Sequence, residues 1–174
     1  MTSKLKTDVL ETVSGSGTIA LTNQLSGMTD ASMPSGSVLQ VVQGSTTTQV
    51  EGSFASEANL GLSASITPSS TSSKILIIVQ AAGCGVRNAS TWWKITLKRD
   101  STKIHNFSSY LGINASVHEA YPNTTHLDSP SSTSAISYNV AGTRSSGSAN
   151  CYFNLSAGGA DAATSTITLM EIQG

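Results

Sequence analysis

The sequence predicts an all-β protein, built as an antiparallel two-sheet sandwich with an extended N-terminal arm. In several strand-length runs apolar residues alternate with polar ones, which is the side-chain period of a β-strand. Threonine and serine are abundant, and they favour strands and turns respectively. Only 11% of the residues are charged and 38% are hydrophobic, so the composition favours a folded chain over a disordered one.

The chain divides into an N-terminal arm and linker, residues 1–37, and a β-sandwich domain, residues 38–174. The arm carries apolar side chains three to four residues apart, at Leu5, Val9, Leu10 and Val13. This spacing fits one short amphipathic helix that needs a partner to cover its apolar face, and the alternative is a solvated terminus. These four residues are the candidates for docking onto a larger assembly.

The sandwich is predicted to begin after a turn at residues 34–37, where proline, serine and glycine cluster. Residues 38–43 follow as a strand that is apolar on both faces. Residues 46–51 form a threonine-rich strand with little apolar content. A strand of this kind belongs at a sheet edge or beside another chain.

The segment around which the domain is organised lies between residues 60 and 80. Residues 60–66 alternate apolar and small side chains, as expected of a strand with one buried face. Residues 75–79 are a continuous apolar run rich in β-branched side chains, which predicts a strand buried on both faces. The turn-forming segment 67–73 separates the two, so they are predicted to pair as a central hairpin.

A second hairpin is predicted after residue 90. Alternation over residues 92–99 places Trp93, Ile95 and Leu97 on one face, and the chain returns through residues 103–107. The next segment, residues 108–134, is too long to be one structureless loop in a compact domain. We expect a strand within it, around residues 115–121, and a functional surface in the remainder.

Three further strands end the chain, each with alternating apolar residues. They cover residues 136–140, 151–155 and 166–170. Counting from residue 38, the sequence predicts about nine strands, the inventory of a two-sheet jelly roll.

Three stretches of the chain resemble the small trimeric jelly-roll domains at the ends of bacteriophage tail or head fibres. They are GLSASITPSSTSSKILIIV at residues 61–79, WKITLKRD at 93–100 and STITLMEIQG at 165–174. The resemblance covers roughly residues 54–174. It implies a virion protein that assembles as a homotrimer.

Catalytic and metal-binding patterns are absent from the sequence. His105, His118 and His126 lack metal-ligand spacing, and the ten acidic residues form no close pair on a strand. No GxSxG nucleophile motif occurs. We therefore expect neither an enzyme nor a cofactor.

Cys84 and Cys151 are expected to be free thiols, with a single disulfide as the alternative.

Binding is the remaining function. Aromatic side chains offer a large contact area at low entropic cost, which makes Tyr110, Tyr121, His126 and Trp92 the candidates for receptor contact. The alternative is that the tryptophans, with Tyr152, fill the sandwich or a subunit interface. A net charge of −1 gives no field to attract nucleic acid or an anionic membrane, and no stretch is long and apolar enough to insert into one.

Taken with the resemblance, these patterns predict a virion structural protein, assembled in the host cytoplasm. The arm would attach the subunit to other virion proteins, and the β-domain would contact a glycan or protein on the host surface. The apolar runs at residues 38–42 and 75–79 exceed what one inner face needs, so we expect a homo-oligomer. The alternatives are a capsid decoration or vertex protein of similar fold and a carbohydrate-binding module.

Overall fold

The computed structural model describes residues 33–86, 90–111, 118–155 and 163–174. Every regular element in these ranges is a β-strand, and no helix there could cross a membrane. The twelve strands are β1 Val38–Thr46, β2 Val50–Gly52, β3 Ala58–Ile66, β4 Lys74–Gln80, β5 Cys84–Val86, β6 Trp92–Arg99, β7 Thr102–Leu111, β8 His118–Ala120, β9 Asn123–Asp128, β10 Ile136–Ser146, β11 Cys151–Phe153 and β12 Ser165–Ile172.

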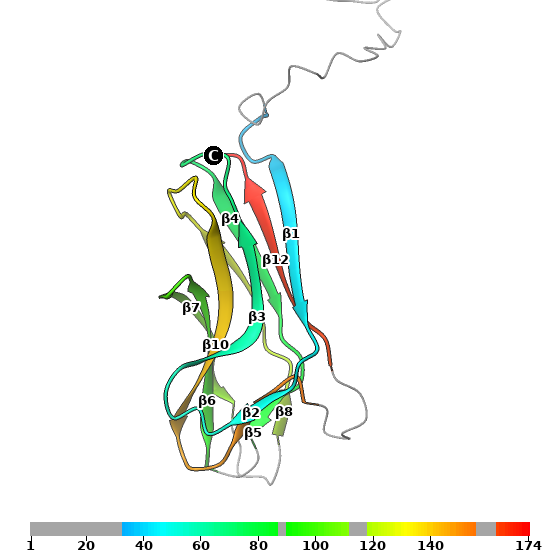
Figure 1. The fold of residues 1–174 in the computed structure, drawn as a ribbon, viewed down its shortest axis with the longest axis vertical. Coiled ribbons are helices and arrows are strands. Elements are labelled where there is room, and N and C mark those ends of the chain that lie inside the picture. The colour runs from blue at the N-terminus through cyan, green and yellow to red at the C-terminus, as the bar shows by residue number, and fades with distance from the viewer. Residues whose placement is uncertain (1–32, 87–89, 112–117, 156–162) are drawn as a thin grey trace, which may run out of the picture.

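Two four-stranded antiparallel sheets form a sandwich (Figure 1). One sheet has the order β1-β12-β4-β9, and the other has the order β3-β10-β6-β7. Apart from the β6–β7 hairpin, the chain crosses from one of these sheets to the other each time it passes from one long strand to the next. This strand order is that of a jelly roll. The predicted all-β sandwich is therefore confirmed.

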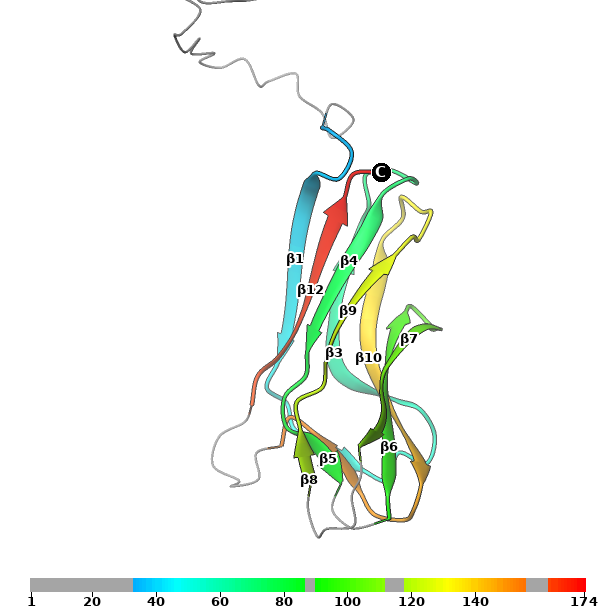
Figure 2. The ribbon, with the colours of Figure 1, turned by 180° about the vertical axis from the view of Figure 1, so that it is seen from behind.

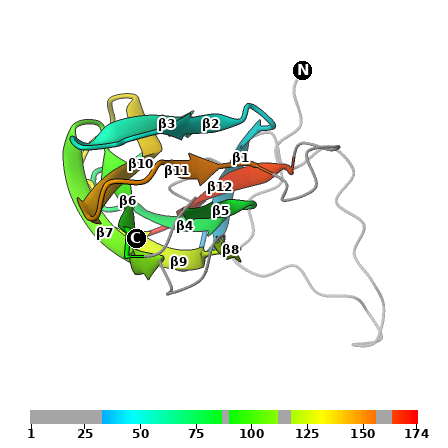
Figure 3. The same cartoon turned by 90° about the horizontal axis from the view of Figure 1, so that it is seen from below.

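A third sheet, of order β2-β11-β5-β8, continues the first one. In sequence β2 follows β1, β5 follows β4, β8 precedes β9, and β11 precedes β12. Each strand of the β1-β12-β4-β9 sheet is therefore continued by one short strand of the third sheet, after a break between the two. Figure 3 shows the molecule from the end where these short strands lie. Joining the four interrupted pairs reduces the twelve elements to eight jelly-roll strands, against the roughly nine predicted.

The core fills the space between the sheets and consists of side chains at alternate positions. The predicted alternation is confirmed in β3 and β12, where every second side chain is buried, and in β6 over residues 93–97 and β10 over residues 136–140, where the predicted inward positions are all buried. The largest fully buried apolar side chains are Trp93, Tyr138, Tyr152, Phe153, Leu60, Leu62, Ile75, Ile77, Ile95, Leu97, Ile167 and Leu169. Each contributes about 1.5–3 kcal/mol through burial.

The central hairpin predicted for residues 60–80 is wrong. β3 pairs with β10, whereas β4 lies in the opposite sheet between β12 and β9. The segment 67–73 crosses between the sheets, so the two strands face each other across the core. Alternation indicates which side of a strand is buried but does not identify the neighbouring strand.

The prediction that residues 75–79 are buried on both faces is also wrong. Ile75, Ile77 and Val79 are fully buried, but Leu76 and Ile78 are only half-buried on the outer side of the sheet. β1 is similar, because Val38 and Val41 are exposed. Among the described residues, no segment covers these outer apolar side chains fully.

The second hairpin is confirmed, with Arg99 opposite Thr102 and Asp100 at the turn with φ of 52°. The strand predicted around residues 115–121 corresponds to β8, which is only three residues long within the described chain. β9, the longer strand that follows, was missed. Its half-buried and buried positions carry Thr124, His126 and Asp128, so it lacks the apolar alternation that marks other strands.

Neither cysteine forms a disulfide, and both are buried. Their strands are neighbours, but Cys151 lies opposite Val86, two residues from Cys84 along β5. Diagonal neighbours of this kind have Cα atoms about 7–8 Å apart, which is too far for an unstrained disulfide. Burial raises the pKa of Cys151 to about 11, which keeps its thiol protonated and unreactive at neutral pH.

Candidate interaction surface

Figure 2 shows the β1-β12-β4-β9 sheet from its outer side. An apolar row crosses all four strands on this face. Val41 lies opposite Met170, Met170 opposite Leu76, and Leu76 opposite Leu127. Val41 is 57% exposed and Leu127 is 51% exposed, while the two side chains between them are half-buried. Because neighbouring strands lie about 4.8 Å apart, the row is about 14 Å long.

The rows beside it extend this surface and add one charge, at Lys74 opposite Ile172. Val38 lies opposite Ile172 on one side, and on the other side Gln43, Thr168, Ile78 and Thr125 stand in register. The Gln43 side chain donates a hydrogen bond to Thr168 Oγ1 at 3.0 Å. Lys74, at the rim, is the one charged side chain among the outward positions of these four strands as described.

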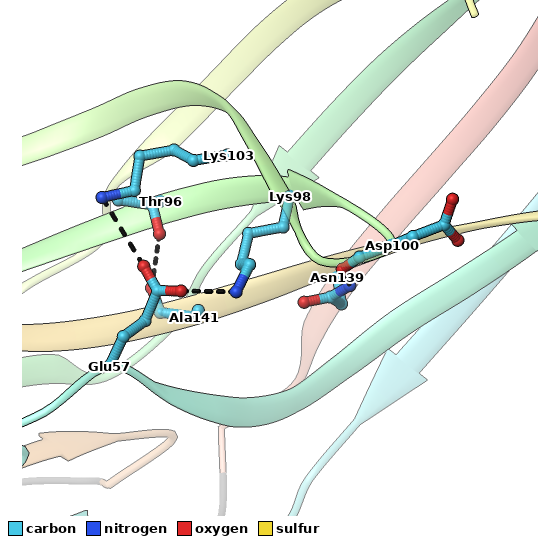
Figure 4. A network of polar contacts seen from close by, with 7 residues as sticks. All are labelled: Glu57, Thr96, Lys98, Asp100, Lys103, Asn139 and Ala141. Atoms are coloured by element: carbon cyan, nitrogen blue, oxygen red, sulfur yellow. Dashed lines mark hydrogen bonds and ion pairs between the residues drawn. The ribbon is translucent and has the colours of Figure 1, made fainter.

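The outer face of the other sheet is different, because charged and amide side chains gather on it (Figure 4). Lys98 Nζ binds Glu57, and Lys103 Nζ lies 3.5 Å from the other carboxylate oxygen of Glu57. The hydrogen bond from Lys98 lowers the pKa of Glu57, although partial burial opposes the shift. Nearby, the Asn139 amide donates to the Asp100 carbonyl at 3.0 Å. This face therefore presents groups that water solvates well.

One open edge of the sandwich, where β7 meets β9, is closed by a polar seam. The rings of His105 and His126 stack with centroids 5.0 Å apart, and Thr124 Oγ1 lies 3.0 Å from His105 Nε2. Arg99 binds both oxygens of the Asp128 carboxylate, at 3.0 and 2.9 Å.

Burial affects ionisation along this seam. It lowers the pKa of His126, and the nearby charge of His105 adds to this effect. Tyr138 donates to Asp128 at 2.7 Å, and its pKa is raised by burial and by this hydrogen bond. Within the described residues, no group of three or more histidine, cysteine or acidic side chains could hold a metal ion.

The end of the sandwich where the arm enters also holds the C-terminus (Figure 1). The turn at 34–37 closes through a hydrogen bond from the Ser37 amide to the Pro34 carbonyl. The Gly36 amide donates to the Gln173 carbonyl, and the Gln173 amide donates to the Ser37 carbonyl, both at 2.8 Å. Residues 36–37 and the C-terminus are thus held side by side, at the end opposite the short strands β2, β5 and β8.

At this end of the sandwich, the buried Glu171 carboxylate links neighbouring segments through hydrogen bonds. Glu171 accepts hydrogen bonds from the Gln40 amide at 2.5 Å and from the Ser69 amide and hydroxyl, both at 2.7 Å. Burial alone raises the pKa of Glu171, but the hydrogen bonds outweigh it and leave the pKa below its ordinary value. Glu171 therefore ties β12 to β1 and to the crossing segment 67–73.

The four receptor-contact candidates do not lie on one strand. Tyr121 is 62% exposed at the joint between β8 and β9, and Trp92 is 37% exposed at the start of β6. His126 is stacked in the polar seam instead of pointing outward. Tyr110 belongs to β7, but its side chain lies outside the described residues. The arm candidates Leu5, Val9, Leu10 and Val13 also lie outside them.

Sequence reasoning missed two features of these surfaces. In β12, Glu171 occupies the next inward position after Ser165, Ile167 and Leu169. This alternation in the sequence could have predicted a buried carboxylate that needs hydrogen-bond donors. The polar seam had no such signal, because β9 is polar on both faces in sequence.

Comparisons with known proteins leave the family of this chain open. Neither a protein-family model nor a curated protein sequence matches it. Among solved structures, it is similar to the crystal structure of the infectious bursal disease virus VP2 subviral particle, with 14% sequence identity and a TM-score of 0.48. The match covers 78% of this chain and 33% of that chain, so the chain spans about a third of the VP2 chain it matches.

Proposed function

We propose that this protein is a virion structural protein, a phage fibre or fibre-tip subunit that works by binding and catalyses no reaction. The arm, residues 1–37, attaches the subunit to other virion proteins, and the β-sandwich contacts the host surface. This proposal rests on one observation, that the attachment point of the arm lies at one end of the sandwich and not at the other. The arm and the C-terminus share one end, which leaves the opposite end free to meet another surface.

Receptor contact is assigned to aromatic side chains away from the arm. Tyr121 and Trp92 are the exposed aromatic residues of the described chain and are the primary candidates. Tyr110 and His126 remain secondary candidates. In a homotrimer each site is present three times, so weak individual contacts gain avidity through effective concentration.

A binding assay tests this function. Fluorescently labelled protein should bind cells of the virus's host, and the double variant Tyr121→Ala with Trp92→Ala should bind at least tenfold less. Ser63→Ala, an exposed change on the outer face of β3, is the matched control and should bind like the wild type. Absence of binding by the wild-type oligomer would contradict the fibre assignment.

A capsid decoration or vertex protein is the second candidate. The broad outer face of β1-β12-β4-β9, whose one charged outward side chain is Lys74, favours it, because such a face could also lie against a shell. A decoration protein should bind purified capsids and raise the temperature at which they release their contents. It should not bind host cells.

A further inference from the structure

We propose that a second copy of this chain covers the outer face of the β1-β12-β4-β9 sheet, with the row Val41–Met170–Leu76–Leu127 at the centre of the contact. This inference rests on the proposed function and deepens it, because it assigns a specific surface to the subunit interface. The same face of each copy turns toward a common symmetry axis, as closed oligomers allow.

Exposed apolar side chains are concentrated on this face. Five large apolar or aromatic side chains are exposed in the described part of the chain, and Val38, Val41 and Leu127 all lie here. Half-buried Leu76 and Met170 lie between Val41 and Leu127 and make the row continuous. A contiguous apolar patch with a polar rim is typical of a protein–protein contact surface.

The charge pattern identifies the occupant. The face carries one charged side chain, Lys74, which lies opposite Ile172 at one end of the patch, so a strongly acidic or basic partner would find little complementary charge. Another copy of the same face would meet a like charge only at Lys74, and the row itself would bury no charge. On the opposite sheet the same arrangement would bring Lys98, Lys103 and Glu57 of two copies together, with a desolvation cost.

The position of the arm agrees with this occupant. Residues 1–32 join the described chain next to Val38, which borders the apolar row. In copies that share this face, the points where residues 1–32 join the described chain therefore lie at the same end. This common end suits attachment to one site on a larger particle.

Charge substitution on the face tests the inference in the full chain. Light scattering should show an oligomer for the wild type and a mass near the monomer value of 17.9 kDa for Val41→Lys with Leu127→Lys. Both positions are more than half exposed, so the fold should tolerate lysine. The matched control, Ser63→Lys with Ser65→Lys on the exposed face of β3, should keep the wild-type mass.

Crosslinking gives a second measurement that does not depend on tolerance of lysine. Val41→Cys with Leu127→Cys, treated with a bis-maleimide, should give covalent oligomers on a denaturing gel, and Ser63→Cys should not. A monomeric wild type, or a lysine variant with unchanged mass, would overturn the inference. Host-cell binding is scored separately, so loss of this interface and loss of the proposed function can be distinguished.

Discussion

At the scale of single residues, β1 and β3 of the opposed sheets approach each other closely at Gly44. A Cβ atom at this position of β1 would lie 2.0 Å from the carbonyl oxygen of Ser63 in β3. That distance is far inside van der Waals contact, and the obstacle is backbone, which cannot rotate away. Glycine is therefore required where β1 crosses β3.

We expect Gly44→Ala to destabilise the protein by about 1–3 kcal/mol or more, because the sheets must separate to admit a methyl group. Urea unfolding measures the loss. Gly52→Ala is the control, since its Cβ would meet nothing closer than a Phe54 ring carbon at 3.8 Å. Equal effects of the two substitutions would contradict the steric explanation.

Asn154 is a second residue on which the fold depends. It is fully buried with φ of 58°, and its amide donates to the carbonyls of Thr46 and Thr48 at 3.1 and 3.2 Å. Its carbonyl accepts from Ser165 Oγ at 2.5 Å, and that hydroxyl in turn accepts from the Ala82 amide at 2.8 Å. These bonds connect the strand pairs β1–β2, β4–β5 and β11–β12 at the breaks between the long strands and their short continuations.

Asn154→Ala should destabilise the protein by about 1–3 kcal/mol for each buried polar group left without a partner. Thermal and urea unfolding should both report the loss. Asn123→Ala, at an exposed position of β9, serves as the control and should stay within about 0.5 kcal/mol of the wild type. A neutral Asn154→Ala would show that the interrupted strands are held by other contacts.

At the scale of elements, the β7–β9 seam makes stability depend on pH. Since the pKa of His126 is lowered in the fold, the unfolded chain binds the proton more tightly. This contribution is present above the ordinary histidine pKa of about 6.5 and is lost as pH falls through the folded value. The charged or titratable groups near the rings are His105, Lys103, Arg99, Asp128 and Tyr138.

The melting temperature of the wild type should therefore fall between pH 7.5 and pH 5, and His126→Gln should reduce this fall. Glutamine keeps a polar side chain in the seam but cannot be protonated. Thr125→Gln, which faces outward on the same strand, should leave the pH dependence unchanged. If His126→Gln and the wild type show the same pH profile, the histidine pair does not control this edge.

At the scale of the whole molecule, the core of the described chain lies within the sandwich. The buried apolar side chains among the described residues lie between Phe54 and Leu169. The polar network at the arm end, around Glu171, also uses only residues of the sandwich. The sandwich should therefore fold without the arm.

A chain that begins at Met33 should unfold cooperatively, with a melting temperature within about 4 °C of the full chain at equal concentration, a difference of about 1 kcal/mol. It should also lose incorporation into virions, because the attachment segment is gone. Calorimetry and virion sedimentation measure the two effects. A truncated chain that unfolds without cooperativity would show that the arm contributes to the core.

Residue type alone predicted only some of the side chains that lie on the candidate surfaces. Aromatic character selected Tyr121 and Trp92, which are exposed, but it also selected His126, which is stacked in the seam. The apolar excess at residues 38–42 and 75–79 predicted burial on both faces, but in the described chain the outer apolar side chains of these strands are exposed or half-buried. It could not indicate that Val41, Leu76, Met170 and Leu127 form one row, because they come from four strands far apart in sequence.

By itself the sequence determined the fold class, most of the strands and their buried sides, because the alternation of side chains is a local property of each strand. Only the tertiary structure decided which strands pair. It placed β3 and β4 in opposite sheets, and it revealed β9, whose polar residues follow no apolar pattern. Strand partners depend on contacts between residues distant in sequence and on the path of each crossing segment, and local side-chain patterns do not encode either.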